Sequence, residues 1–480
     1  MIKVFYNILY YSLGNYFPLL ASFLLLPIYT KYLSPEDYGE IAFIQVIVAI
    51  INIFLTLQLQ SSVSRYFVDF LNDKAKLQKY ISTIFYSIVF ISFFITLTVI
   101  LIFIFFEKYY FMDFDSQFNN LLLLALLTAN FVAYTSISKA VLKFEEKGKL
   151  FFFCEVFCSL LSIISYFYFV VILNYGVTGV IYSGLIISII SFIIFFIFTK
   201  SYFVLKYNFE YLLPSLRFSW PLIPHALSSF LFISSDRILL EKYVPMASLG
   251  IYAIASRLSS PVGLLIENMN SAYSPYLFKA FNNNLKKGHI EFRKLSNLLL
   301  FFTLVIITFF FTFARELVWI LTQPNFHEAY FPAMVLSLCY IFRLYYGFFG
   351  SSIIFIKKTK IFPFITILCG ISNIVLNLIF IPKYGIIAAA YTTLFSYFLQ
   401  CFISYFISRS YFPLSFSRPR NAVSLSLFLF TITIQLLINY QFKNLLLSIM
   451  TKSLIILIFF SLCYYILNIN SHLIRFKEKL

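Results

Sequence analysis

The stretch KYLSPEDYG, residues 31–39, occurs twice in this chain in recognisable form. An altered copy, KYVPMASLG, occupies residues 242–250, 211 positions later, and keeps the Lys, the Tyr and the Gly. A second pair of segments, YGVTGVIY at 175–182 and YGIIAAAY at 384–391, lies 209 positions apart. Each match alone is short, but two matches with nearly the same offset predict that the chain contains two duplicated halves.

The first copy also predicts its own local structure. Ser34 is a good helix N-cap, Pro35 suits the first helical position, and Asp37 falls three residues after the cap, as in a capping box. We therefore expect a helix to begin at this stretch.

The composition indicates an integral membrane protein. Of 480 residues, 61% are hydrophobic and 11% are charged, whereas a soluble globular protein is about 45–50% apolar and about 25% charged. The net charge of +17 is better explained by the basic loops that orient membrane proteins than by nucleic-acid binding. The six cysteines all fall in apolar segments without metal-ligand spacing, so we expect small core residues and neither disulfides nor a metal site.

A membrane-spanning helix needs about 20 mostly apolar residues. We expect an all-α protein with about 14 transmembrane helices, near 7–30, 40–64, 80–106, 120–140, 150–173, 178–199, 218–240, 248–272, 295–320, 331–356, 361–381, 385–408, 421–439 and 446–469. With the N and C termini in the cytoplasm, 26 of the 36 Lys and Arg residues fall on the inner side, as the positive-inside rule requires. Six fall on the outer side, namely Lys31, Lys108, Lys242, Lys383, Lys443 and Lys452.

The repeat divides these helices into two lobes. Six crossings return the chain to the same side, so helices 1–6 and 7–12 have the same orientation and are related by an axis along the membrane normal. We expect a lobe at 1–210, a second lobe at 211–415, and additional helices 13 and 14 with a cytoplasmic tail at 416–480. In transporters built from such repeats the substrate site lies between the halves.

Three segments carry a resemblance to a known family. They are LLPIYTKYLSPEDYGEIAF at 25–43, SRYF at 64–67 and PLIPHALSSFLFISSDRILLEKY at 221–243. In these segments the chain resembles the Wzx-type oligosaccharide and O-antigen flippases of the polysaccharide transporter family. That family shares a superfamily, the multidrug, oligosaccharidyl-lipid and polysaccharide exporters, with multidrug and toxin extruders and lipid II flippases.

The resemblance implies a transporter and no enzyme. It implies alternating access of a bilobed cavity that moves an undecaprenyl-diphosphate-linked oligosaccharide, for O-antigen, lipopolysaccharide, capsule or a related polysaccharide, across the bacterial inner membrane. It suggests sodium or protons as coupling ions, with no other cofactor, and leaves open a partnership with polysaccharide polymerase machinery. We expect contacts with membrane lipids and with the lipid-linked sugar, and no binding of nucleic acid.

Two other interpretations of the function stay open. A lipid II flippase or a multidrug extruder has the same fold, although a drug exporter favours an acidic cavity and the deepest charges here are arginines. The acidic pair at Asp113-Phe114-Asp115 resembles that of polyprenyl-dependent membrane glycosyltransferases and polymerases. An enzyme of that kind needs a larger outer loop than this chain has, so we expect no catalytic residues.

Four arginines fall inside predicted spans: Arg237, Arg257, Arg315 and Arg343. A cation at mid-bilayer costs at least about 2.5–3.5 kcal/mol unless it faces a cavity or a partner. At 1.5 Å per residue Arg257 lies about 14 Å, and Arg343 about 18 Å, into its helix. Neither has an acid three or four residues away on its own helix, and Arg suits bidentate phosphate contacts. We therefore expect Arg257 and Arg343, with Arg65 at the inner end of helix 2, to contact the diphosphate.

Further residues are candidates for moving parts of the transporter. Asp236, Arg237, His225 and Glu267 are candidates for a gate or for ion coupling. Prolines break the equivalent first helices of the two halves, and because proline frees backbone carbonyls we expect hinges there. These hinge residues are Pro18, Pro27, Pro221 and Pro224.

Overall fold

The computed structural model describes residues 2–70, 72–110, 116–356, 358, 360–441 and 445–467. Every regular element in these ranges is helical, which confirms the all-α prediction. The acidic pair Asp113 and Asp115 lies outside the described residues. The chain forms two compact units, Met1–Gly250 and Ile251–Leu480.

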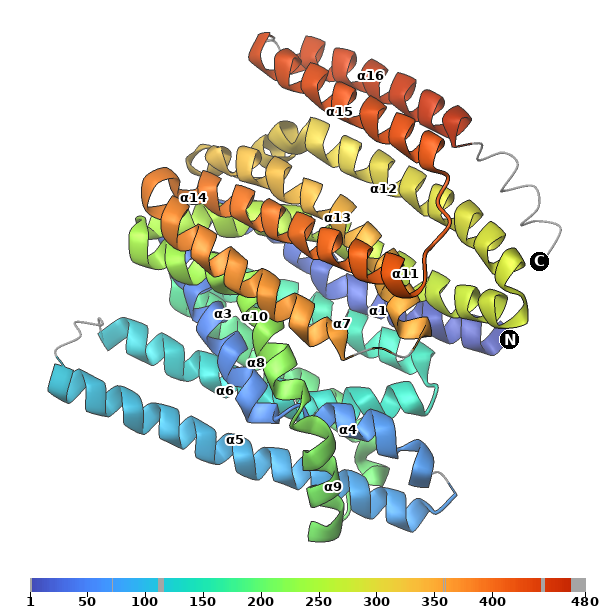
Figure 1. The fold of residues 1–480 in the computed structure, drawn as a ribbon. Helices are drawn as coiled ribbons and strands as arrows, with labels where there is room; N and C mark the ends of the chain where they lie inside the picture. Colours follow the sequence, from blue (N-terminus) through green and yellow to red (C-terminus); the bar gives the residue numbers. More distant parts are fainter. Residues whose placement is uncertain are drawn as a thin grey trace. The chain divides into compact units, whose positions relative to one another are not determined.

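The described part of the first unit contains ten α-helices (Figure 1). They are α1 (Ile2–Leu24), α2 (Leu26–Tyr32), α3 (Pro35–Thr56), α4 (Leu59–Tyr66), α5 (Lys74–Tyr110), α6 (Ser116–Phe144), α7 (Gly148–Tyr166), α8 (Gly176–Thr199), α9 (Phe209–Ser219) and α10 (Leu222–Tyr243). Three short segments follow some of these helices. η1 (Val68–Phe70) and η3 (Lys200–Tyr202) are 3₁₀-helical, and η2 (Phe167–Ile172) is π-helical. Leu59 and Val63 of α4 lie in one core with Tyr80 of α5 and Leu212 of α9.

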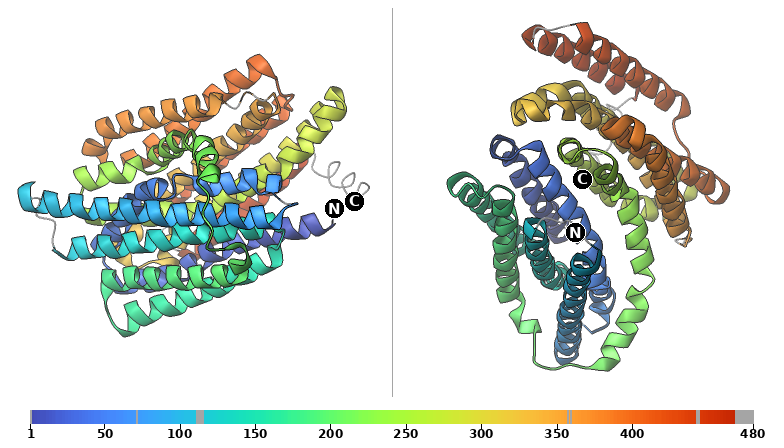
Figure 2. Two further views of the ribbon diagram at one scale, coloured as in Figure 1. Left: turned by 90° about the horizontal axis from the view of Figure 1, so that it is seen from below. Right: turned by 90° about the vertical axis from the view of Figure 1, so that its left-hand side faces the viewer.

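The second unit consists mainly of longer helices. They are α11 (Met246–Asn283), which begins just before the division, α12 (Leu285–Leu321), α13 (Tyr330–Phe355), α14 (Ile361–Tyr411), α15 (Arg418–Gln441) and α16 (Leu445–Ile466), with a short η4 (Pro324–Ala329) between α12 and α13. Helices α15 and α16 run side by side along most of their length (Figure 2).

Twelve helical segments of the described chain are long and apolar enough to cross a membrane. α14 counts once among them, although its backbone breaks at Gly385 into two arms. α10, at the predicted seventh span, is not among them, and its serines, Asp236 and Arg237 lower its hydropathy. The exact number of 14 and the side on which the termini lie stay predictions.

The internal repeat is visible in the backbone of each copy. α3 begins at Pro35 after Ser34, whose side chain accepts a hydrogen bond from the Asp37 N–H, while the Asp37 carboxylate accepts one from the Ser34 N–H. This confirms the predicted capping box. At the corresponding position, 211 residues later, α11 begins at Met246. In the second pair of segments, Gly176 and Gly385 both have positive φ, +55° and +58°, a conformation that glycine adopts readily.

The two copies of the opening stretch also touch each other. A Cβ added to Gly39 would overlap the carbonyl oxygen of Met246, and a Cβ added to Gly250 would overlap that of Pro35. Pro35 corresponds to Met246, and Gly39 to Gly250, so the contact is reciprocal. The glycine retained in both copies is therefore explained by a backbone crossing that has no room for a side chain.

The helices are more broken than the sequence predicts. The predicted second helix, 40–64, is interrupted at Leu57 and Gln58, which both have left-handed backbone conformations. α9 is a separate short helix that was not expected. Lys452, expected among the outer lysines, is instead completely buried in α16.

Replacing Gly39 or Gly250 by Ala should destabilise the protein in detergent. The added methyl group would press on a backbone carbonyl, and such overpacking costs about 1–3 kcal/mol. We expect the melting temperature to fall by several degrees. Gly184→Ala is the matched control, because the nearest atom to its Cβ, the Tyr166 hydroxyl, lies at 3.8 Å; its melting temperature should stay level or rise. Equal melting temperatures for the three variants would contradict the crossing.

Candidate functional site

Arg343 is the centre of a polar cluster in the second unit. Its Nη2 donates a hydrogen bond to Oε1 of Glu267, forming an ion pair between α13 and α11. Its Nη1 lies 3.4 Å from the hydroxyl of Tyr397 on α14, and its guanidinium lies over the Tyr397 ring, 6.0 Å from the centroid. Three helices therefore hold one guanidinium about halfway along α13.

Two glycines allow α11 and α13 to approach closely enough for this pair. Gly263 of α11 lies against the ring of Tyr340, and Gly347 of α13 lies against the side-chain amide of Asn270. A Cβ at either glycine would overlap these groups. The close contacts flank the ion pair on each helix, so helix packing sets the position of Arg343 before any substrate binds.

The ion pair at the centre of the cluster is only partly shielded from its surroundings. The side chains of Arg343 and Glu267 are 26% and 46% exposed. Arg has five N–H donors in a planar fork, and the contacts with Glu267 and Tyr397 leave donors for a second anion. The site can therefore hold an anion next to a guanidinium that is already oriented.

The partner of Arg343 was not predicted from the sequence, because it lies on another helix. Arg343 has no acid near it on its own helix, but the partner comes from α11, 76 residues earlier. The pair joins a residue predicted to bind diphosphate with one predicted to act in gating or coupling. Glu267 neutralises Arg343 and positions it.

The other predicted anion-binding arginines lie elsewhere. Arg257 is on α11, ten residues and about 15 Å along the axis from Glu267, and is partly exposed. Arg65 ends α4 in the first unit, where its Nη1 donates to Asp69 at 3.0 and 3.1 Å. This Arg65 pair is exposed, and such pairs contribute at most about 1 kcal/mol, so Arg65 can exchange Asp69 for another anion at little cost.

On α10, the predicted gate and coupling residues Asp236 and Arg237 are adjacent, and His225 lies near the start of the helix. Asp236 is buried, and its Oδ1 accepts a hydrogen bond of 2.8 Å from the N–H of Arg237. His225 is partly buried in the first turn of the same helix. About three turns of helix separate Asp236 from His225.

The predicted hinge prolines lie at helix breaks in three of four cases. Pro27 is in the first turn of α2, directly after the interruption at Leu25. Pro221 is the N-cap of α10 and Pro224 lies in its first turn, after the break that follows α9. Pro18 instead lies inside the continuous helix α1. The motion at these breaks stays a prediction.

Sequence reasoning missed a buried amide cluster within α14. Asn377 donates to Oδ1 of Asn373 at 2.9 Å, Asn373 donates to the Ser396 hydroxyl at 3.0 Å, and Thr392 donates to Oδ1 of Asn377. These bonds hold the two arms together on either side of Gly385. The signal was present in the sequence, because two asparagines four residues apart share one face of an apolar helix.

An apolar cavity of about 510 Å³ lies along the same arms. Its lining is almost entirely hydrocarbon and aromatic, and consists of Leu376, Phe380, Tyr384, Ile387, Ala388, Tyr391, Thr392 and Phe395. Chemically it suits a hydrocarbon chain.

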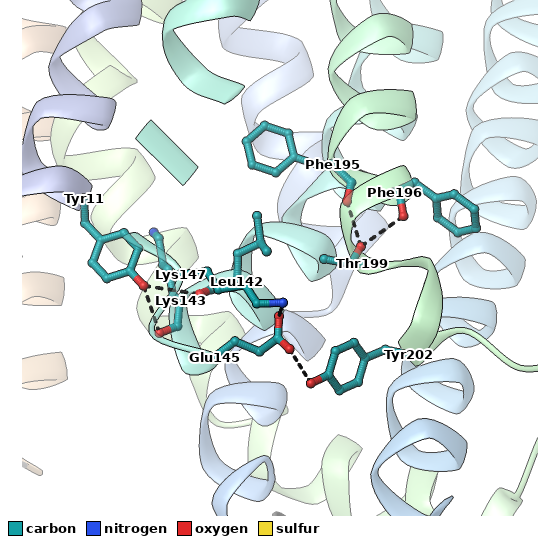
Figure 3. A network of polar contacts seen from close by, with 9 residues as sticks. All are labelled: Tyr11, Leu142, Lys143, Glu145, Lys147, Phe195, Phe196, Thr199 and Tyr202. Carbon is teal, nitrogen blue, oxygen red and sulfur yellow. Dashed lines mark hydrogen bonds and ion pairs between the residues drawn. The ribbon is translucent and has the colours of Figure 1, made fainter. Parts of the chain in front are cut away.

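In the first unit a polar network fixes a lysine-rich turn between α6 and α7 (Figure 3). Glu145 accepts a hydrogen bond of 2.5 Å from the Tyr202 hydroxyl and pairs with Lys147 at 3.0 Å. The Tyr11 hydroxyl of α1 donates to the carbonyls of Leu142 and Lys143. The network ties α1, α6 and η3 to this turn.

Glu155, a further acid in a predicted span, is also paired. Its Oε1 lies 2.5 Å from Nζ of Lys139, which lies over the ring of Phe195. The carboxylate is buried, so this ion pair links α7 to α6 inside the first unit.

Comparison with known proteins relates this chain to polysaccharide biosynthesis proteins. Residues 28–330 match the family described as polysaccharide biosynthesis protein. The Lsg locus putative protein 1 of Haemophilus influenzae is 24% identical over 84% of this chain and 99% of its own length. The capsular polysaccharide biosynthesis protein CapF of Staphylococcus aureus is 25% identical over 85% of this chain and 99% of its own length.

Solved structures share the fold at low sequence identity. The lipid II flippase MurJ, in an inward closed conformation, is 20% identical, with a TM-score of 0.71 over 95% of this chain and 98% of its own. An inward-facing multidrug resistance transporter of the MATE family is 15% identical, with a TM-score of 0.64 over 83% of this chain and 94% of its own. These likenesses establish the fold.

A double-mutant cycle tests the central cluster. Glu267→Ala and Arg343→Ala should each lower the melting temperature, because each leaves its partner charge uncompensated. The double variant should lose less than the sum, with a coupling of about 0.5–3 kcal/mol. Arg65→Ala and Asp69→Ala provide the control cycle, and their exposed pair should couple by at most about 1 kcal/mol. Strictly additive losses at Glu267 and Arg343 would show that the ion pair does not form.

Proposed function

The chain belongs to the polysaccharide biosynthesis protein family, and we propose that it flips an undecaprenyl-diphosphate-linked oligosaccharide across the bacterial inner membrane by alternating access. Family and fold place it among multi-pass membrane transporters and flippases, not among enzymes. The proposed cargo is the repeat unit of an O-antigen, capsule or related polysaccharide, delivered to the leaflet where polymerase machinery acts.

The observation that carries this proposal is the oriented, partly exposed guanidinium of Arg343. The cargo has a diphosphate with about two negative charges, a polar glycan and a long apolar tail. A guanidinium in a site of low dielectric constant attracts such an anion more strongly than it would in water. Since Glu267 and Tyr397 already hold Arg343, little side-chain entropy is lost when the diphosphate arrives.

Other features of the protein suit the anionic head group and the apolar tail of the proposed cargo. The exposed Arg65 and the lysine-rich turn around Lys143 and Lys147 lie in segments predicted to face the cytoplasm, where the anionic head group first arrives. The apolar cavity along α14 has the chemistry of a surface for a polyprenyl tail. The curated relative CapF is itself a capsular polysaccharide biosynthesis protein.

A drug extruder and a lipid II flippase have the same fold. A drug cation requires a free acid, whereas Glu267 is neutralised by Arg343, so the cluster favours an anionic cargo. Lipid II is also a diphosphate, and the cluster alone does not distinguish its glycan. An ion gradient, of sodium or protons, would drive the cycle.

Deletion of the gene should cause one lipid-linked oligosaccharide to accumulate in the inner leaflet. Complementation with Arg343→Ala at normal protein level should slow surface-glycan export by about ten- to a hundredfold, because a hydrogen bond to a charged group contributes about 1.5–3 kcal/mol. Arg343→Lys should restore little, since it cannot form the bidentate contact, and Arg257→Ala should also slow export.

Arg409→Ala is the matched control, because Arg409 is exposed near the end of α14 and hydrogen-bonds with Tyr405. It should complement fully. Mass spectrometry of the accumulated lipid identifies the cargo and separates lipid II from other glycans. Full complementation by both Arg343→Ala and Arg257→Ala would contradict the proposed anion site.

A further inference from the structure

Residues 200–220, which we call the surface segment, join α8 to α10 in the first unit and contain η3 and α9. Polar side chains of α5 hold the first half of this segment by hydrogen bonds. Gln78 donates to the Ser201 carbonyl at 2.7 Å, Ser82 donates to the Tyr202 carbonyl at 3.2 Å and accepts from the Val204 N–H at 2.8 Å, and Thr83 accepts from the Asn208 N–H at 3.1 Å. The backbone of the surface segment is thus fixed against the first turns of α5.

The second half of the surface segment packs through one face of α9. Leu212 is buried in the same core as Tyr80 of α5. The Tyr80 hydroxyl donates to the Ser62 hydroxyl of α4 at 3.2 Å and lies 3.3 Å from the Ser215 hydroxyl of α9. One hydroxyl group therefore joins α9 to α4, the helix that carries Arg65.

α9 runs across the direction of α5, not along it (Figure 1). Residues Lys74–Ile102 of α5 form one of the candidate membrane spans. The two helices meet at Tyr80, six residues, or about 9 Å, from the start of that span. This end carries Lys74, Lys76 and Lys79 and is predicted to face the cytoplasm. A helix that crosses a spanning helix near its end lies along the surface of the membrane.

A second face of α9 exposes large apolar side chains. Phe209, Leu213 and Trp220 follow one another at intervals of four and seven, so they form one stripe along the helix. They are 64%, 44% and 67% exposed, and Leu205, in the loop just before α9, is 95% exposed. Burying such a side chain contributes about 1.5–3 kcal/mol, which is lost for each of them in water. Exposed apolar surface of this kind marks a contact with a membrane or with a protein.

The charges around this stripe indicate what covers it. The surface segment carries three basic residues, Lys200, Lys206 and Arg217, and one acid, Glu210, all of them exposed. Glu210 and Arg217 border the stripe on the side away from the buried face of α9. An apolar stripe bordered by cations fits the interface of a membrane that contains anionic lipids, where each Lys or Arg contributes about 1 kcal/mol of attraction. A purely apolar protein surface would leave these cations without a role.

We propose that the surface segment is a binding site for the anionic head groups of the cytoplasmic leaflet. Its apolar side chains enter the boundary between head groups and hydrocarbon, and its cations contact lipid phosphates. Since Tyr80 joins α9 to α4, the bound lipids hold α4, and with it Arg65, near the depth of the head groups. This site is independent of the identity of the cargo.

Fluorescence of Trp220 tests the depth of the surface segment. The chain has two Trp residues, so Trp319→Phe gives a single-Trp protein, which is reconstituted at full length in vesicles of phosphatidylglycerol and phosphatidylethanolamine. Lipids brominated on the acyl chain near the head group quench Trp by contact. They should lower Trp220 emission at least about twofold, because the apolar face of an interfacial helix lies about 5–10 Å into this boundary. Iodide in the aqueous phase should quench Trp220 much less.

A tryptophan on the polar side of the same helix is the control. Glu210→Trp, in a chain with Trp220→Phe and Trp319→Phe, should be quenched mainly by iodide, because Glu210 lies outside the apolar stripe. Two results for Trp220 would overturn the proposal. Quenching mainly by iodide would place Trp220 in water, and quenching by neither reagent would show that protein covers it.

Energy transfer from Trp220 to labelled lipids tests the cations. In the single-Trp protein, transfer to dansyl-labelled phosphatidylglycerol should exceed transfer to dansyl-labelled phosphatidylcholine at least about twofold, because nearby Lys and Arg side chains attract anionic lipids. Adding Lys206→Gln and Arg217→Gln should remove this difference. Lys31→Gln with Lys242→Gln is the matched control and should keep it, because both lysines are exposed in the same unit but predicted on the outer side. Equal transfer to the two lipids in the single-Trp protein, or a preference that survives the Lys206 and Arg217 substitutions, overturns head-group binding.

Discussion

Hydrocarbon cannot satisfy a charge or a hydrogen bond, and the ion pairs between the described helices of this fold follow from that constraint. Three basic residues inside the two units each find an acid on a different helix: Lys139 with Glu155, Arg343 with Glu267, and Lys452 with Glu316. The pairs serve as fixed points between α6 and α7, α13 and α11, and α16 and α12. Helices that share only apolar contacts can slide or repack, whereas helices joined by an ion pair cannot part without separating two charges.

The repeat was predictable because it follows from backbone geometry. Gly39 and Gly250 recur where two helix starts cross, and Gly176 and Gly385 recur where the backbone turns through positive φ. Hydropathy predicted an all-helical chain with many long apolar helices, and capping chemistry predicted the start at Pro35. The break at Leu57 and Gln58 was not predicted, because neither residue type favours a left-handed conformation and tertiary packing must impose it.

The site was only half predictable for a different reason. Depth along a helix can be counted, so Arg343 was identified from sequence as a cation deep inside a predicted span. Its partner could not be identified, since pairing between helices depends on which faces meet, and a contact across 76 residues leaves no local spacing to read. The same limit applies to Lys452, which was assigned to the outer side from its place in the sequence, whereas its acid lies 136 residues earlier on α12.

That long separation has a consequence for how the protein is made. α12 leaves the ribosome well before α16, so Glu316 enters the membrane while its cation has not yet been synthesised. A lone Lys inside a membrane-spanning helix costs up to about 2.5–3.5 kcal/mol on insertion, so α16 inserts most easily if α12 is still beside it. α16 is thus inserted late, and its entry into the bilayer depends on an earlier helix, because the pair between Lys452 and Glu316 forms only after α16 has been synthesised.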